Sequence, residues 1–190
     1  MAAQTKPGAS DWEQAYDCYF PLLFRYSLRF TADRDIIKDL LQDLFLDLYL
    51  KRELPGSIRN LRSYLLVSVR RNLLKRLSRE AARRMIPFSE ESNDFLLELS
   101  AESRIIAGEL LESRSHYLQK AVDSLTRRQK EAVYLRFYEN LSYDEIGEIM
   151  GMKEVKYART LIYRAISEMK ATLKKAGSPI CLALLLSPRF

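Results

Sequence analysis

Apolar residues recur every three or four positions along several stretches of this chain, which is the spacing of an amphipathic helix. Residues 10–28, 61–77, 127–140, 142–150 and 155–173 follow this period. The clearest stretch spans residues 33–52, where one side of the expected helix carries Ile36, Ile37, Leu40, Leu41, Leu44, Phe45, Leu48 and Tyr49. The pattern predicts an all-α protein.

Capping signals indicate where several of these helices begin. A Ser or Thr followed three residues later by Glu or Gln can form a capping box. Asn60 is also expected to cap the helix that follows it. Pro21 falls inside the first helix, where we expect it either to kink that helix or to start a second one. The capping boxes are the pairs Ser10 and Glu13, Thr126 and Gln129, and Ser142 and Glu145.

Two helices near the carboxyl end form the sequence pattern of a helix-turn-helix. Gly151 separates them and suits the left-handed backbone of a tight turn. The second helix is apolar on one side, from Val155 to Leu173, and the other side has no acid. A basic, polar face on the second helix is typical of DNA binding, although a solvated face on an ordinary helical hairpin is the alternative. That face contains Lys156, Arg159, Thr160, Tyr163, Ser167 and Lys170.

Charge is distributed unevenly along the 190 residues, although the net charge is only +6. Residues 59–84 hold nine bases and one acid, for a local charge of +8. Residues 86–112 hold seven acids and one base, for −6, and residues 152–175 hold seven bases and two acids, for +5. Two basic blocks around an acidic one predict two nucleic-acid surfaces joined by a segment that nucleic acid would repel.

Asp39, Asp43 and Asp47 stand four residues apart on the helix expected over residues 33–52. Like charges at this spacing repel one another and destabilise a helix, so something should compensate for them. They are either solvated or face a basic partner. Leu46 and Leu50 lie outside the main apolar stripe and favour the second interpretation, because exposed apolar residues are suited to docking.

A second line of residues follows one face of the helix expected over residues 61–77. An aromatic residue with bases and a hydroxyl on one face suits stacking on unpaired bases and contact with phosphates. The alternative is that the aromatic ring is packed and the bases are merely solvated. The line consists of Tyr64, Ser68, Arg71 and Lys75.

No pattern of an enzyme, cofactor site or metal site is found in the sequence. His116 is the single histidine and is expected at a surface or a domain seam. Two cysteines, Cys18 and Cys181, predict a reducing, cytoplasmic setting. The first residues show no secretion signal, and the apolar run at residues 180–186 is too short to span a bilayer, which needs about 20 residues.

Three segments together resemble the extracytoplasmic-function sigma factors, the two-domain class of bacterial transcription initiation factors. DLLQDLFLDLY at residues 39–49 resembles the family's DLVQEVFLRLW segment. NLRSYLLVSVRRNLL at residues 60–74 resembles the helix that melts and reads the −10 promoter element. LTRRQKEAVYLRFYENLSYDEIGEIMGM at residues 125–152, followed by ARTLIYRAI, resembles the domain that reads the −35 element. The three segments occur in family order and cover roughly residues 11 to 175.

The resemblance implies an initiation factor that is not an enzyme and that binds core RNA polymerase (its beta-prime and beta subunits) and promoter DNA. It also implies a loop at residues 54–60 that holds a flipped promoter base, an acidic linker in the path of RNA, and in many members an anti-sigma protein. The implied polymerase contacts are Asp39, Gln42, Asp43, Phe45 and Leu46. The implied −10 contacts are Asn60, Arg62, Tyr64, Ser68, Arg71, Asn72 and Lys75, and the −35 contacts are Lys153, Lys156, Tyr157, Arg159, Thr160, Tyr163 and Arg164.

The predicted organisation is two small helical domains joined by an acidic linker. The first, 10–85, resembles sigma region 2, and the second, 106–176, resembles sigma region 4 and contains the helix-turn-helix. Residues 86–105 form the linker, and 177–190 form an apolar tail without a counterpart in the family. Two rival interpretations are a helix-turn-helix regulator that needs no polymerase and an RNA-binding or adaptor protein without sequence preference.

Overall fold

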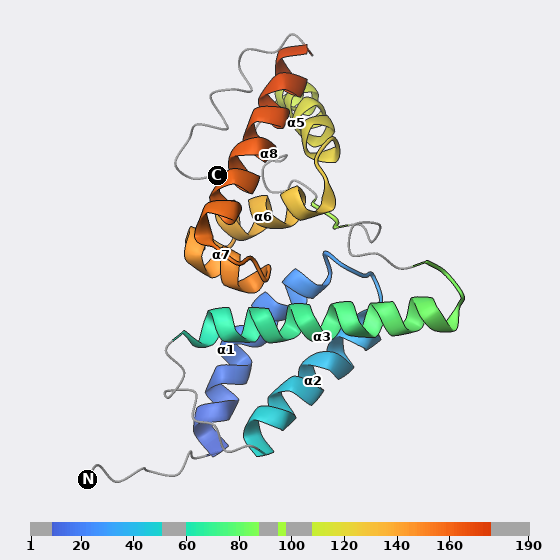
Figure 1. Ribbon diagram of the computed structural model, residues 1–190, viewed down its shortest axis with the longest axis vertical. Coiled ribbons are helices and arrows are strands. Elements are labelled where there is room, and N and C mark those ends of the chain that lie inside the picture. Colours follow the sequence, from blue (N-terminus) through green and yellow to red (C-terminus); the bar gives the residue numbers. More distant parts are fainter. Residues whose placement is uncertain (1–8, 51–59, 88–94, 98–107, 176–190) are drawn as a thin grey trace, which may run out of the picture. The chain divides into compact units, whose positions relative to one another are not determined.

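A computed structural model of the protein describes residues 9–50, 60–87, 95–97 and 108–175, except for the side chains of residues 9–12 and 108–115. These ranges contain seven helices and no strand, which confirms the predicted all-α fold (Figure 1). The chain divides into two compact units, Met1–Glu90 and Glu91–Phe190. The predicted domain boundaries at residues 85, 105 and 176 stay predictions, and the apolar tail lies outside the described residues.

The amino-terminal unit contains α1 (Ala9–Ser27), α2 (Arg34–Leu50) and α3 (Leu61–Arg83), and each helix packs against the other two. Figure 1 shows α3 crossing both α1 and α2. Their apolar faces meet in one core because each helix repeats apolar residues at helical spacing. Fully buried members of this core include Leu23, Tyr26, Ile37, Leu41, Leu65, Val69 and Leu73.

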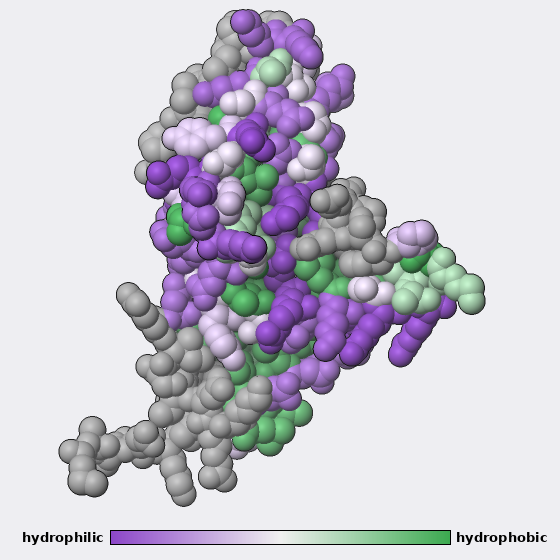
Figure 2. Space-filling view, viewed as in Figure 1, coloured by the Kyte–Doolittle hydropathy of each residue, from purple (hydrophilic) through white to green (hydrophobic). Residues whose placement is uncertain are grey.

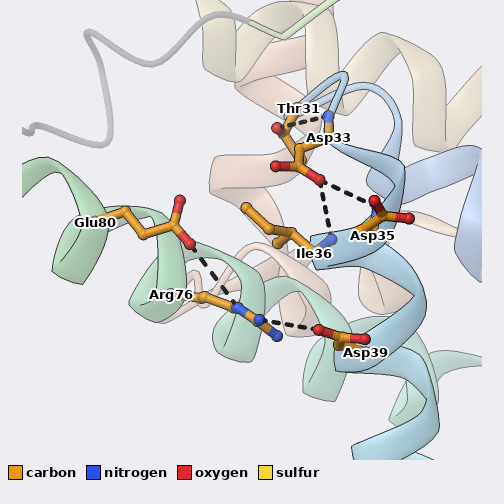
Figure 3. Close-up of polar contacts among 7 residues, drawn as sticks. All are labelled: Thr31, Asp33, Asp35, Ile36, Asp39, Arg76 and Glu80. Atoms are coloured by element: carbon orange, nitrogen blue, oxygen red, sulfur yellow. Dashed lines mark hydrogen bonds and ion pairs between the residues drawn. The ribbon is translucent and has the colours of Figure 1, made fainter.

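Side-chain caps set the beginnings of α2 and α3. Asn60 accepts a hydrogen bond from the Ser63 amide at 3.1 Å, which confirms its predicted role. The Asp33 carboxylate caps α2 by accepting from the amides of Asp35 and Ile36, each at 3.1 Å (Figure 3). Helix α1 continues through Pro21, so no second helix starts there.

The carboxyl-terminal unit contains α5 (Gly108–Asp123), α6 (Arg127–Phe137), α7 (Tyr143–Ile149) and α8 (Val155–Lys175). Helix α8 packs against the other three, and α6 also packs against α7. Capping boxes begin α6, at Thr126 and Gln129, and α7, at Ser142 and Glu145, as predicted. Gly151 turns the chain between α7 and α8 with φ +65°, the left-handed geometry expected of it.

Part of the segment expected to be a linker packs into the carboxyl-terminal unit. Phe95 is fully buried with its ring centroid 5.8 Å from that of Tyr134, and Leu97 is also buried. The Gln119 side chain donates a hydrogen bond to the Leu97 carbonyl at 3.3 Å. Residues 95–97 are not helical. They therefore form a structural part of this unit.

Within the described ranges, no helix has both the length and the hydrophobicity required to cross a membrane. Cys18 is exposed and unpaired, and Cys181 lies outside those ranges. His116 is also exposed, beside the ring of Tyr117.

Candidate nucleic-acid interface

Helix α8 separates a buried apolar side from an exposed polar side. Ala158, Ile162 and Ala165 are at most 1% exposed and hold the helix against its unit. The side chains predicted to contact the −35 element are all exposed, including the large rings of Tyr157 and Tyr163. We call these seven residues the recognition face: Lys153, Lys156, Tyr157, Arg159, Thr160, Tyr163 and Arg164.

An acid, Glu154, directly precedes α8 and lies among the residues of the recognition face in the sequence. The Glu154 carboxylate forms an ion pair with the Lys156 ammonium at 2.8 Å. The same ammonium lies 5.3 Å from the centre of the Tyr157 ring. Both side chains of the ion pair are more than half exposed, so solvent screens their attraction strongly. Lys156 is thus held by contacts within its own segment.

Arg159 is contacted by another helix. Its guanidinium lies 5.4 Å from the centre of the Tyr143 ring, at the beginning of α7. The Arg136 guanidinium, in the last turn of α6, lies 4.8 Å from the same centre. Arg136 also donates a hydrogen bond to the Leu141 carbonyl at 2.7 Å. Sequence reasoning identified neither Tyr143 nor Arg136, because both lie outside α8 and no spacing rule links them to Arg159.

In α2 the residues expected to bind polymerase divide between surface and core. Asp39, Gln42 and Asp43 are exposed, and Leu46 is 56% exposed. Phe45 was expected in the apolar stripe of this helix and was also an implied polymerase contact. It is only 8% exposed, and its ring centroid lies 5.0 Å from that of Tyr16 in an edge-on contact. Phe45 therefore packs in the core instead of facing a partner.

Tyr49 lies at the surface of α2, in contrast to its prediction. It was expected on the core side of α2 and is instead 52% exposed. Together with Leu46 and Leu50, it gives this helix an exposed apolar strip beside its acidic residues. Exposed apolar residues next to charged ones are typical of a protein-docking surface.

Bases of α3 face the acids of α2. An Arg76 Nη atom lies 3.4 Å from an Asp39 carboxylate oxygen, and the Arg76 Nε lies 4.0 Å from Glu80 (Figure 3). Beyond this pair the two helices line a groove of about 510 Å³. This α2–α3 groove is lined by Leu40, Asp43, Asp47, Asn72, Lys75, Arg76, Arg79, Glu80 and Arg83. The repulsion expected along the acids is thus reduced within the protein by bases of α3.

The residues predicted to contact the −10 element do not form one exposed face. Arg71 and Lys75 are exposed and Tyr64 is half-buried, whereas Ser68 is 7% exposed and lies in the core. Asn60 is occupied as the cap of α3. Arg62 is half-buried, two residues from Tyr64 and hence on a different side of the helix, and Asn72 faces the α2–α3 groove. In Figure 2 hydrophilic residues gather along the carboxyl-terminal half of α3, and hydrophobic residues lie at its end.

Comparison with known proteins identifies the two helical units. The model of sigma-70 region 2 matches residues 15–83, and the model of sigma-70 region 4 matches residues 115–169. Together these matches cover more than half of the chain. The chain belongs to the sigma-70 family. Region 2 followed by region 4 is the organisation of the extracytoplasmic-function sigma factors, and the family consists of initiation factors and not of enzymes.

Individual sigma factors agree with this assignment. RNA polymerase sigma factor SigV of Bacillus subtilis is 40% identical over 58 residues, which are 30% of this chain and 34% of SigV, so the match spans about a third of that relative. The sigma factor RpoE of Bartonella quintana, solved in complex with the anti-sigma factor NepR, has the same fold. The TM-score is 0.57 at 18% identity, over 87% of this chain and 98% of RpoE.

Proposed function

We propose that this sigma factor binds core RNA polymerase and directs it to specific promoters. In this proposal the amino-terminal unit binds polymerase and the −10 element, and the carboxyl-terminal unit reads the −35 element. The observation that carries the proposal is the exposed recognition face on the second helix of a helix-turn-helix. Arg side chains that reach base edges in the major groove give sequence preference, while Lys and Arg contacts with phosphates give affinity.

The proposed polymerase-binding surface consists of Asp39, Gln42, Asp43 and Leu46 on α2. Exposed carboxylates and an apolar side chain on one helix suit a partner surface that is basic and partly apolar. Phe45 supports this surface from the core and does not belong to it. An anti-sigma protein is a further partner in this proposal, because the structurally similar RpoE was solved with one.

On α3 we retain Arg71 and Lys75 as candidate contacts with the opened promoter strand, with Tyr64 as a stacking residue. Two exposed bases near an aromatic ring supply what single-strand binding requires. Neither unit is expected to hold a promoter strongly alone, and joining them on polymerase raises their effective concentration. The protein would work without a cofactor, in the cytoplasm, and would catalyse no reaction itself.

Run-off transcription tests this proposal. Purified core polymerase is mixed with fragments of the source genome, with and without the full-length protein. We expect discrete transcripts that depend on the protein and share sequence elements upstream of their start points. A transcript pattern that is the same with and without the protein would contradict the proposal. Specific binding of duplex DNA without polymerase, combined with no effect on transcription, would favour an ordinary helix-turn-helix regulator.

A further inference from the structure

We propose that Tyr143 is a positioning residue that orients Arg159 for reading the −35 element. This inference rests on the proposed function, since it concerns how the recognition face binds DNA. It extends that face to a residue outside α8. The observation behind it is that two guanidiniums lie over the Tyr143 ring, with Arg136 at 4.8 Å and Arg159 at 5.4 Å from the ring centre.

The ring is held in place by its own surroundings. Tyr143 directly follows Ser142, whose amide donates to the Glu145 carboxylate at 2.8 Å and whose hydroxyl accepts from the Glu145 amide at 3.3 Å. This capping box fixes the backbone at the first residue of α7. Tyr143 is half-buried, so part of its ring surface is already covered by protein.

Arg136 supports the ring from the side of α6. Its Nη1 donates to the Leu141 carbonyl at 2.7 Å, and Leu141 is only 1% exposed. The hydrogen bond ties this guanidinium to a buried part of the α6–α7 turn. Arg136 thus connects the end of α6 with the Tyr143 ring.

Arg159 is the exposed partner of this arrangement. It is exposed on α8, and a free arginine loses much rotamer freedom when it binds DNA. Both guanidiniums lie within the roughly 6 Å over which an aromatic ring attracts a cation. Because the ring restricts Arg159 before binding, less freedom remains to be lost. Lys156 differs, since its contacts, Glu154 and Tyr157, are neighbours in its own segment.

The test is a binding selection with holoenzyme assembled from core polymerase and full-length protein. The probe is a library of promoter fragments randomised across the −35 segment. We expect Tyr143→Leu to weaken binding to the selected sequence by about three- to tenfold, since it removes the ring and restores freedom to Arg159. Preference should fall at the same base position at which Arg159→Ala loses it. Tyr143→Phe keeps the ring and should behave like wild type.

A double-mutant cycle separates positioning from simple support of the fold. If Tyr143 acts through Arg159, Tyr143→Leu should have little further effect in an Arg159→Ala background. A general loss of structure would instead add to the effect of Arg159→Ala and lower the melting temperature of the free protein. Additive effects, or base preference that is unchanged in Tyr143→Leu, would overturn the inference.

Tyr143→Phe also tests a rival role for the hydroxyl. If the hydroxyl binds a phosphate, Tyr143→Phe should weaken binding to all sequences equally, and that result would overturn the positioning role. Failure of the proposed function is distinguishable from failure of this inference. If wild-type holoenzyme selects no −35 sequence, the proposed function fails, whereas selection by wild type with identical selection by Tyr143→Leu rejects the inference alone.

Discussion

Helices α3 and α8 are both strongly basic, but the lysines and arginines of the two helices are contacted by different groups. On α3, Arg76 pairs with Asp39, and Lys75, Arg79 and Arg83 share a groove with acids of α2. At α8, Lys156 pairs with Glu154, which directly precedes the helix, and Arg159 lies over an aromatic ring. The positive charge of a helix therefore does not by itself show which of its lysines and arginines are available to bind DNA. The bases of α3 partly serve to balance α2, while those of α8 are exposed and oriented.

The largest expected effect comes from α2, where Phe45 lies in the core and the neighbouring Leu46 is exposed on the proposed polymerase-binding surface. Phe45→Ala should lower the free energy of unfolding by about 3–5 kcal/mol, because it removes a buried aromatic ring. The neighbouring Leu46→Ala is the matched control and should change stability by no more than about 0.5 kcal/mol. Chemical denaturation of both variants measures the difference. Equal losses of stability in the two variants would contradict the assignment of Phe45 to the core and of Leu46 to the surface.

The next effect concerns the acids of α2. Reversing Asp39 and Asp43 to Lys should weaken binding to core polymerase by about 3 kcal/mol, roughly a hundredfold, if they face basic groups there. The same change makes the α2–α3 groove more basic, so binding of free protein to nonspecific DNA should strengthen and become more salt-dependent. Co-purification and DNA titration measure the two effects. The Asn variants at both positions are the control for charge reversal, and undiminished polymerase binding in the Lys variant would contradict the assignment.

A smaller effect distinguishes the two basic helices directly. Arg159→Ala should cost about 1–3 kcal/mol of binding to the preferred promoter and relax preference at one base position. Lys75→Ala on α3 should instead weaken binding of all promoters similarly and reduce the salt dependence, as loss of a phosphate contact does. Both variants are compared as holoenzymes at several salt concentrations. If Lys75→Ala altered base preference in the −35 segment, the contrast between the helices would be lost.

The smallest effect concerns the acid on the recognition face. Glu154→Gln releases Lys156 from its ion pair and removes a negative charge next to DNA. Promoter affinity should rise by about 0.5 kcal/mol at low salt, roughly twofold, and the gain should shrink at high salt because the groups are exposed. Binding titrations in two buffers suffice to measure it. A loss of affinity would indicate that Glu154 itself contacts DNA or positions Lys156 for it.

Local signals in the sequence were sufficient to predict most of the helical framework. The capping boxes at Thr126 and Ser142 and the cap at Asn60 form as expected, because each depends on residues three positions apart. The exposed side of α8 was equally predictable, since its apolar residues repeat with a strict period. Of the two outcomes expected at Pro21, a kink or the start of a second helix, the second does not occur. A proline removes a hydrogen bond, but packing kept α1 continuous.

Features that depend on the packing between helices were not predictable. Periodicity could not show that Ser68 is buried or that Tyr49 is exposed, because the width of a buried stripe depends on how neighbouring helices pack. Nor could it place Phe95 against Tyr134, which lies 39 residues away. The pairing of Asp39 with Arg76 and the contact between Tyr143 and Arg159 also join residues from different helices. No local spacing rule covers such pairs.

Transcription from a mixture of promoters with the Arg159→Ala holoenzyme tests most directly whether the exposed face of α8 chooses the promoter. The wild-type holoenzyme should use promoters that share one −35 sequence. With polymerase binding unchanged, Arg159→Ala should use a broader set that is degenerate at one position of that element. The account would be contradicted if both holoenzymes chose identical promoters, or if Arg159→Ala lost transcription only because it no longer bound polymerase.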